Sequence, residues 1–412
     1  MQNLSSSSWV AAARLLWQAG EAEAALAVLE TAALALPEDA RPLIGRIEVA
    51  AMGDDYLAAR YAMQDLVRHG APDVLTACLT DDADVAFRLA QLWVSVDGRD
   101  RRSRIWLGHC LDRMDWYVPP QPSGYTPESY AQAVAPTLRR LSLQPPHGAD
   151  ALTLWRDWLH PTDGPEMRGE VLASQAGAHS SHNWGAARLI QLCQAARDAT
   201  RLEDGFQLFD LFVDDGAFGV LRFRLPDGEV VTWDQIISAR DLSLLCQWVG
   251  LTPADTPLLV DIGAGYGRLV HRFLQAFPSS YALALDSVPG TSAMAELYLA
   301  TRGCAGRVEI DGPRRLLAPL PPGRPRIATN IHSWSEAPLI SIEAWLEALA
   351  TAQIDWLLLA THDESAVTLE LDGPHQPMLP AFLAGGWTLV HDQPRFPSIP
   401  FNTGYLRLFR RG

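Results

Sequence analysis

A glycine-rich segment in the C-terminal half of the chain carries the strongest chemical signal. It follows an apolar stretch at 258–262 that is expected to form a buried strand. The loop itself consists of Gly263, Ala264, Gly265, Tyr266 and Gly267. A strand that runs through glycines into a helix lets the backbone approach a ligand without an intervening side chain, and open α/β sheets bind ligands at such strand ends. We therefore predict a ligand site at this loop.

The glycine spacing argues against the usual dinucleotide loop and predicts a different ligand. A dinucleotide site has the pattern G-x-G-x-x-G, but this chain has Arg268 where the third glycine would stand. From Asp261 the pattern is D-x-G-x-G-x-G, without the lysine of a phosphate-binding loop. The residues favour a ligand that has no pyrophosphate but has a cationic amino-acid end, which the charge of Asp261 suits. A tight strand–helix turn without a ligand is the simpler alternative.

Acidic residues after the next two expected strands complete this predicted site. Asp286 ends the apolar strand at 281–285, and Ser287 follows it. A carboxylate at this position is able to accept two hydrogen bonds from ribose hydroxyls. Asp311 follows the third strand and is expected to reach an adenine ring, although an aspartate before Gly312 is also a common turn residue.

Two polar clusters follow the strands expected at 326–331 and 354–360. The first cluster is Asn330, His332 and Glu336, and the second is His362 and Asp363. Histidine titrates near neutral pH, so His332 is the first candidate for a general base and His362, with Asp363, the second. A metal site uses the same residue types, but no ligand spacing requires one and we predict none. In the alternative without catalysis, both residues have structural roles: His332 is a turn residue and Glu336 only begins a helix.

These side chains need a sheet that brings the strand ends together. Strands are expected at 258–262, 281–285, 307–310, 326–331, 354–360, 386–391 and 404–410. Helices are expected between them near 266–277, 290–302, 339–351 and 375–384. Apolar strands that alternate with helices predict a mainly parallel sheet covered on both faces.

The first part of the chain has the pattern of paired helices. Small and apolar residues between Trp9 and Pro37 fit one tetratricopeptide-type repeat, and a weaker copy runs from about Ala40 to Pro72. Two repeats do not bury a continuous core, so the helices expected at 84–94 and 103–114 must cap them. Two interpretations remain open: the region docks a protein partner or a second copy, or it only packs against the rest of the chain.

Proline-rich breaks at 118–122 and 144–148 indicate connections between domains. We divide the chain into a helical, tetratricopeptide-like domain at 1–117, a mainly helical linker region at 118–250 and an α/β domain at 251–412. The linker region contains a predicted β-hairpin near 220–232. Thr232 has the spacing of a helix cap, and the helix after it is expected to end near Gly250.

Composition and charge limit the kind of partner. The chain has 412 residues and a formal charge of −15, so its bulk charge does not attract nucleic acid. Its five cysteines include no C-x-x-C pair of a zinc or redox site. Because we find no signal-peptide pattern and no apolar stretch of about 20 residues, we expect a soluble, cytoplasmic protein without a membrane span.

Three segments together resemble a known family. They are 261–268, the stretch from Asp286 to Leu299, and 329–336. They are similar to class I S-adenosylmethionine-dependent methyltransferases and, more narrowly, to bacterial sugar O-methyltransferases found with polysaccharide biosynthesis. The resemblance covers about Trp184 to the end and leaves out the helical front. It implies a Rossmann-like fold with the final strand tucked into the sheet, S-adenosylmethionine as cofactor, and a sugar or glycosylated intermediate as acceptor.

The resemblance assigns roles to the residues named above. Those expected to hold the cofactor are Asp261, Gly263, Ala264, Gly265, Tyr266, Gly267, Asp286, Ser287, Asp311 and Asn330. Those expected to serve the acceptor hydroxyl are His332, Glu336, His362 and Asp363, with Arg395 and His391 as weaker acceptor contacts. Two other functions remain open: a non-catalytic scaffold that recruits a partner through its helical front, and a methyltransferase for another small molecule.

Overall fold

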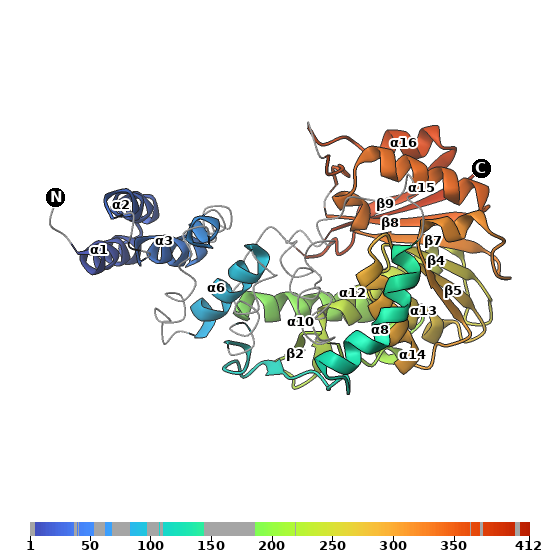
Figure 1. Ribbon diagram of the computed structural model, residues 1–412, viewed down its shortest axis with the longest axis horizontal. Coiled ribbons are helices and arrows are strands. Elements are labelled where there is room, and N and C mark those ends of the chain that lie inside the picture. Colours follow the sequence, from blue (N-terminus) through green and yellow to red (C-terminus); the bar gives the residue numbers. More distant parts are fainter. Residues whose placement is uncertain are drawn as a thin grey trace. The chain divides into compact units, whose positions relative to one another are not determined.

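The computed structural model describes most residues of the chain. They are 5–36, 39, 41–52, 62–67, 83–96, 107, 110–143, 186–218, 220–362, 364–370, 374–399 and 404–412. The chain forms two compact units (Figure 1). The first unit comprises Met1–Pro120, Gly169–Leu192 and Gly219–Val230, and the second comprises Gln121–Arg168, Cys193–Phe218 and Val231–Gly412. The region 118–250 is therefore shared between the two units.

The first unit begins with helices. They are α1 (Ser6–Gln18), α2 (Ala22–Ala35), α3 (Arg41–Met52) and α6 (Ala83–Val96). Gly20 has a φ of 85° and turns the chain between α1 and α2, and Ala13, Ala25 and Leu29 are buried between the helices. The predicted helix–turn–helix is thus present, and its assignment to the tetratricopeptide type stays a prediction. Gly53 and the rest of the turn in the weaker copy lie outside the described residues.

A small sheet consists mostly of residues of the first unit, and its last strand crosses the boundary between the two units after Val230. Its strands, in spatial order, are β1 (Tyr117–Val118), β2 (Arg222–Arg224) and β3 (Val230–Thr232). The β2–β3 pair is the hairpin predicted near 220–232. Trp116 stacks on Phe223 with ring centroids 5.3 Å apart, which buries one side of this sheet.

A seven-stranded sheet organises the second unit, in the order β6-β5-β4-β7-β8-β10-β9. Its strands are β4 (Leu258–Ile262), β5 (Tyr281–Leu285), β6 (Val308–Asp311), β7 (Arg326–Ile331), β8 (Trp356–Thr361), β9 (Trp387–Pro394) and β10 (Tyr405–Arg411). The strands from β6 to β8 are parallel, whereas β10 runs antiparallel between β8 and β9. The mainly parallel sheet and the tucked final strand are both confirmed.

The strand order reverses at β4, which lies between β5 and β7. In open parallel sheets, such a reversal leaves a crevice at the carboxyl ends of the two central strands, because their connecting helices lie on opposite faces. The loop after β4 begins at this crevice. The fold thus places the glycine-rich segment where α/β proteins bind their ligands.

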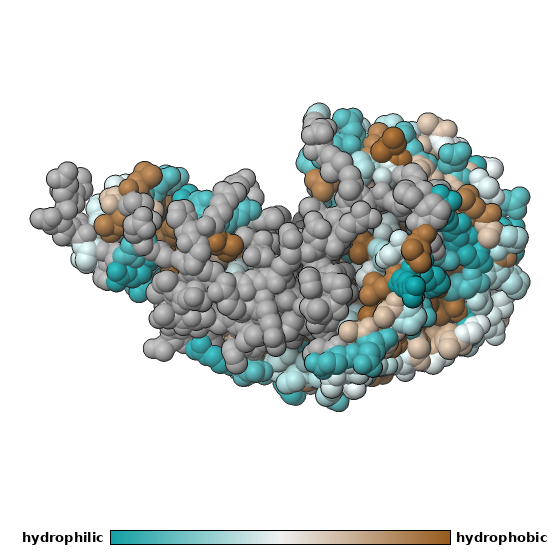
Figure 2. Space-filling view, in the orientation of Figure 1, coloured by the Kyte–Doolittle hydropathy of each residue, from teal (hydrophilic) through white to brown (hydrophobic). Residues whose placement is uncertain are grey.

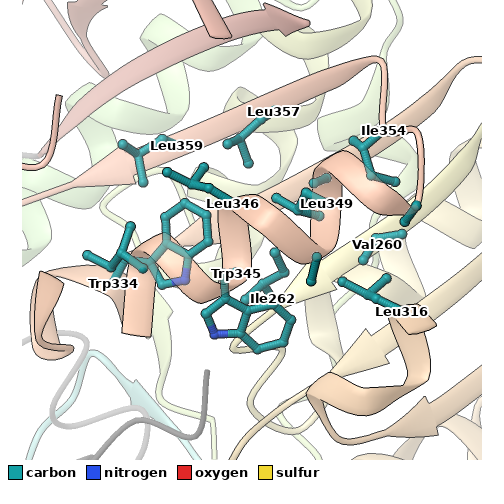
Figure 3. Close-up of a cluster of buried hydrophobic side chains, with 14 of the residues drawn as sticks. Val260, Ile262, Leu316, Trp334, Trp345, Leu346, Leu349, Ile354, Leu357 and Leu359 are labelled. Atoms are coloured by element: carbon teal, nitrogen blue, oxygen red, sulfur yellow. The ribbon is translucent and has the colours of Figure 1, made fainter. Parts of the chain in front are cut away.

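Helices cover both faces of this sheet. They are α8 (Pro127–Ser142), α11 (Leu208–Leu211), α12 (Trp233–Val249), α13 (Arg268–Ala276), α14 (Pro289–Thr301), α15 (Leu339–Thr351) and α16 (Leu379–Ala384), with the 3-10 helices η1 (Pro313–Leu317) and η2 (Ser333–Glu336). The helix α10 (Ala186–Glu203) begins within the residues of the first unit and ends within those of the second. On one face, α15 and α16 close a buried apolar cluster (Figure 3). On the other, α13 contacts β4 and β5, and α8 packs along α14.

The apolar cluster explains why α15 forms where it does. Trp345, Leu346 and Leu349 recur at helical spacing, and Figure 3 shows them directed toward side chains of the sheet such as Ile262 and Leu357. Each such side chain, when buried, contributes about 1.5 to 3 kcal/mol to folding. The predicted helix at 339–351 is confirmed to the residue.

The helix predicted at 375–384 is shorter in the structure, since α16 begins only at Leu379. The residues before it pair with an earlier segment instead. The Gln376 carbonyl accepts the Thr368 N–H at 2.9 Å, although in a longer helix it would accept an N–H one turn later, and Pro377 forms a β-bridge with Val367. These tertiary contacts use backbone groups that a longer helix would have needed, so the helix starts later than its apolar pattern indicates.

The outer surface of the second unit mixes polar and apolar residues on the face shown in Figure 2. Large exposed apolar side chains include Ile340 and Leu383, on α15 and α16. Among the described residues, no helix has both the length and the apolar character needed to cross a bilayer.

Candidate functional site

The three glycines of the loop after β4 all have left-handed backbone conformations, with φ of 69° at Gly263, 55° at Gly265 and 87° at Gly267. Two of them also lack room for a side chain. A Cβ at Gly263 would collide with the Ser333 side chain, and one at Gly267 would lie 2.7 Å from Leu299 Cδ1. A Cβ at Gly265 would meet nothing within 4 Å. Gly265 is therefore the position where the backbone is open to an approaching ligand.

Asp286 joins this loop to the end of β5. One carboxylate oxygen accepts the Gly265 N–H at 3.0 Å, and the other accepts the Val288 N–H at 2.8 Å. Burial raises the pKa of Asp286 to about 6, and repulsion from the Glu336 carboxylate acts in the same direction. The predicted ribose-binding carboxylate thus lies directly beside the open glycine.

Asp261 lies within β4 and is almost fully buried. Its carboxylate accepts a hydrogen bond from the Thr329 hydroxyl of β7 at 2.7 Å. Burial raises the pKa of Asp261 to about 7, and the nearby charge of Asp286 adds to this rise. The carboxyl ends of β4 and β5 therefore carry acidic groups that repel each other.

Asn330 lies near the end of β7 and is held by hydrogen bonds. Its amide nitrogen donates to the Ile262 carbonyl at 3.0 Å and to the Ser333 hydroxyl at 2.5 Å, and its oxygen accepts the Trp334 N–H at 3.0 Å. The side chain is fully buried, and both of its N–H donors bind within the protein. This geometry gives Asn330 the role of holding Ser333 against Gly263.

The remaining predicted cofactor residues occupy different surroundings. Ala264 donates its N–H to the Leu285 carbonyl at 3.2 Å, and Ser287 is half-buried at the end of β5. Tyr266 turns inward, with its ring centroid 5.6 Å from that of Tyr298. Asp311 accepts the Gly312 N–H at 2.8 Å and lies 3.6 Å from Nη1 of Arg140, an arginine of α8.

The predicted polar clusters after β7 and β8 meet through their histidines. The rings of His332 and His362 stack with centroids 4.6 Å apart and planes 8° from parallel. The His332 backbone is left-handed, with φ of 69°, and its N–H donates to the Ala360 carbonyl of β8 at 3.0 Å. Glu336 is buried at the end of η2 on the side of Asp286, and Asp363 lies outside the described residues.

Sequence reasoning missed a layer of ion pairs that holds the start of α13. Arg272 pairs with Asp214 at 2.6 Å and also with Asp234, and Arg268 pairs with Asp234 at 2.8 Å. Burial alone would raise the pKa of Asp214, but Arg272 and Arg268 outweigh it and lower the pKa below its ordinary value. The available signal was the four-residue spacing of the two arginines, which puts them on one face of the helix.

The residues that the structure describes include no cluster of three or more histidine, cysteine, aspartate or glutamate side chains that would hold a metal ion. The cysteines among them, such as Cys193 and Cys246, are buried and unbonded to one another, and burial raises the pKa of their thiols.

Comparisons with known proteins give structural neighbours only. No protein-family model matches the chain, and no curated protein matches it. Similar solved structures include an O-methyltransferase family protein from Burkholderia thailandensis, at 15% identity over 44% of this chain and 60% of that chain, with a TM-score of 0.31. Another is a SAM-dependent methyltransferase from Aquifex aeolicus, at 13% identity over 52% and 97%, with a TM-score of 0.30.

A third is a magnesium protoporphyrin IX methyltransferase from Synechocystis with bound SAM, at 15% identity over 52% of this chain and 97% of that chain, with a TM-score of 0.33. These neighbours are S-adenosylmethionine-dependent or O-methyltransferase family proteins, and each aligns with about half of this chain. The function of the site must therefore be inferred from its own residues.

Proposed function

We propose that the second unit binds S-adenosylmethionine at the glycine-rich loop and transfers its methyl group to a hydroxyl of a sugar or glycosylated intermediate. The observation that carries this proposal is the hydrogen bond from the open Gly265 to Asp286 at the topological switch point of the sheet. A backbone N–H, an open approach and a carboxylate on the next strand are what a nucleoside ligand requires there.

The charges of the site suit this cofactor. Asp261, Asp286 and Glu336 concentrate negative charge beside the loop, and the first two have raised pKa values because burial is not offset by a cation. Ion pairs to Asp261 and Asp286 are absent among the residues that the structure describes. A ligand with a sulfonium and an ammonium group would neutralise these carboxylates, whereas a pyrophosphate would be repelled.

Residues of the chain have separate roles in binding the ribose, positioning the loop and accepting the proton. A carboxylate has about four lone-pair positions, so Asp286 retains acceptors for ribose hydroxyls beyond its two backbone bonds. Asn330 keeps Ser333 in place behind Gly263, and Asp311 borders the space assigned to the adenine. When bound, S-adenosylmethionine supplies a methyl group on a leaving sulfur, which departs with the electron pair of the carbon–sulfur bond. A hydroxyl is a weak nucleophile, and the stacked histidines offer a base for its proton.

Calorimetric titration of the full chain with S-adenosylmethionine tests the donor site. We expect one site per chain in the wild type and at least a tenfold weaker affinity in Asp286→Ala, since about 1.4 kcal/mol corresponds to a factor of ten. The matched control is Asp255→Ala, which removes a half-buried carboxylate that bonds Thr252 at the opposite end of β4. Absence of binding heat with both S-adenosylmethionine and S-adenosylhomocysteine in the wild type would refute the proposal.

A glycine variant separates binding from folding. Gly265→Ala adds a methyl group into space that is open in this structure, so we expect weakened binding with a cooperative unfolding transition preserved. If Gly265→Ala binds as tightly as the wild type, the ligand does not approach the loop on this side.

The acceptor and the role of the first unit are further parts of the proposal. Release of S-adenosylhomocysteine in the presence of sugars or nucleotide-linked sugars would identify a hydroxylated acceptor, and release only with amines would contradict O-methylation. We also propose that the protein acts in the cytoplasm and that the helices α1, α2, α3 and α6 dock a partner or a second copy. Crosslinking of the isolated chain tests self-association directly.

A further inference from the structure

A serine in the turn after β7 closes one side of the glycine-rich loop. The Ser333 side chain lies against Gly263, where an added Cβ would collide with both its Oγ and its Cβ. The next nearest atom is Nδ2 of Asn330, which would lie 3.9 Å away, at an ordinary van der Waals distance. Among the described residues, Ser333 is therefore what excludes a side chain at the first glycine of the loop.

Three hydrogen bonds connect this serine with the end of β4. Asn330 Nδ2 donates to Ser333 Oγ at 2.5 Å, and Ser333 Oγ donates to the Ile262 carbonyl at 3.3 Å. The other N–H of the Asn330 amide donates to the same carbonyl at 3.0 Å. These bonds use both amide hydrogens, the hydroxyl hydrogen and both lone pairs of the carbonyl, so the arrangement is complete without a ligand.

The peptide between Ile262 and Gly263 is thereby held from both neighbouring strands. Its carbonyl is held from the β7 side by the bonds just described, and its N–H donates to the Leu285 carbonyl of β5 at 2.8 Å. A loop whose first peptide is fixed at both polar groups leaves its strand in one direction. The open Gly265, two residues later, therefore has a fixed place beside β5.

Trp334 connects the serine to the apolar core. The Trp334 N–H donates to Asn330 Oδ1 at 3.0 Å, and its ring is 2% exposed, with its centroid 5.6 Å from that of Phe382. Figure 3 shows this ring among the buried side chains beneath the sheet. Ser333 and Gly263 are both partly exposed. Their contact therefore lies where the packed core ends and the crevice begins.

We propose that Ser333 is a positioning residue for the cofactor: it fixes the first peptide of the loop, so that Gly265 and Asp286 meet the ligand without rearrangement. This inference rests on the proposed function, because the ligand is the cofactor assigned to that loop. Groups that are already in place bind more tightly, since less conformational freedom is lost on binding. The first glycine of the loop then serves contact with the protein, and the second serves the approach of the ligand.

Calorimetric titration of the full chain with S-adenosylmethionine tests the proposal, at a temperature where circular dichroism shows every variant to be folded. Ser333→Ala keeps the Cβ and removes the hydroxyl, and we expect an affinity about two- to tenfold weaker, the usual effect of a lost hydrogen bond. Gly263→Ala should bind at least about tenfold more weakly, because its Cβ displaces the serine.

Combined variants separate positioning from general damage. Ser333→Gly removes both atoms that meet the new Cβ, so it should weaken binding in the wild type but improve binding by at least about threefold in Gly263→Ala. Ser333→Ala retains its Cβ and should restore less. In Gly265→Ala, where the added Cβ meets nothing within 4 Å, Ser333→Gly should only weaken binding further. A serine with a purely structural role would not reverse the sign of its effect between these two backgrounds.

Unchanged affinity in both Ser333→Ala and Ser333→Gly would overturn the proposal, and so would additive effects of Ser333→Gly and Gly263→Ala. If Gly263→Ala does not fold, the double variant should regain both folding and binding, and the single serine variants still decide.

Thermal unfolding of the same proteins keeps the two proposals apart. Ser333→Gly should raise the unfolding midpoint of Gly263→Ala whether or not the cofactor binds, because the collision is removed. Absence of binding heat in the wild type, with this rise present, would refute the proposed function and the ligand role of Ser333 with it. Binding by the wild type without any coupling in affinity would refute the positioning role alone.

Discussion

Two sets of aspartates near the glycine-rich loop have opposite electrostatic states. On the crevice side, Asp261 and Asp286 have pKa values raised to about 7 and about 6 by burial. On the α13 and α14 side, Asp214 and Asp215 have lowered pKa values, because Arg272 and Arg302 respectively pair with them. The same residue type is therefore stabilised as an anion in one region and destabilised as an anion in the other.

This contrast separates structural charge from charge kept for a ligand. An ion pair compensates a buried carboxylate within the protein, as on the α13 side. On the crevice side the partners are neutral: the Thr329 hydroxyl and the N–H groups of Gly265 and Val288. Raised pKa values in a crevice are typical of functional sites, because only a bound group completes their environment.

The largest loss of stability should come from breaking the buried ion pair between Arg272 and Asp214. Arg272→Met leaves the buried Asp214 carboxylate without its closest arginine, and we expect a loss of about 3 to 5 kcal/mol in the free energy of unfolding. Urea denaturation followed by circular dichroism measures it. A loss below about 1 kcal/mol would mean that Arg268 alone compensates Asp214 and that the contrast is overstated.

Asp261 and Asp286 should make stability depend on pH in the direction opposite to Asp214 and Asp215. Because their folded pKa values are raised, they make the free energy of unfolding fall as pH rises. The folded pKa of Asp261, about 7, lies above the ordinary value of about 3.9, so its contribution is fully present below about pH 4 and is lost as pH rises through 7. The slope is at most about 1.4 kcal/mol per pH unit for this carboxyl. Asp261→Asn should remove that part of the slope and unfold less readily than the wild type at pH 8. Parallel pH profiles of the two proteins would contradict this.

Gly265 and Gly267 should also differ, the first in ligand binding and the second in packing. Gly267→Ala and Gly265→Ala share the strain of a left-handed alanine, but only the first brings a Cβ to 2.7 Å from Leu299. We expect Gly267→Ala to be less stable than Gly265→Ala by about 1 to 3 kcal/mol, the usual cost of overpacking. Thermal unfolding of both variants measures the difference, and equal stabilities would show that Leu299 moves aside without cost.

The smallest loss of stability is expected for the more exposed ion pair, between Arg302 and Asp215. Arg302 and Asp215 have side chains that are 22% and 36% exposed, so water already screens their pair. Arg302→Met should cost less than about 1 kcal/mol in the same urea experiment. A cost comparable to that of Arg272→Met would show that burial does not distinguish the two pairs.

Much of the fold was predictable because local pattern and tertiary structure agree. The bounds of β4, β5, β7 and α15 match the expected ranges to the residue. Apolar strands of about five residues flanked by glycine or aspartate leave little choice of boundary. The start of α16 was not predictable, because Gln376 bonds to Thr368, a partner that no local window contains.

The candidate site shows the same limit. The identity and order of Asp261, Gly265 and Asp286 indicated a ligand loop before any coordinates, since strand ends in a parallel sheet must share an edge. The hydrogen bond between Gly265 and Asp286 could not be predicted without the fold. So did the inward turn of Tyr266 and the internal use of the Asn330 amide, because side-chain direction depends on neighbours brought from other elements.

The sequence by itself determined the alternation of strands and helices, the position of the glycine-rich loop and the residue types available for chemistry, because these depend on local periodicity and composition. Only the tertiary structure decided which carboxylates meet arginines and which two histidine rings stack. Asp241 and Arg395 are 154 residues apart, and Arg395 and His332 are 63 apart. Electrostatics acts over a few ångströms in space, so the state of each charged group is set by neighbours that the chain order does not reveal.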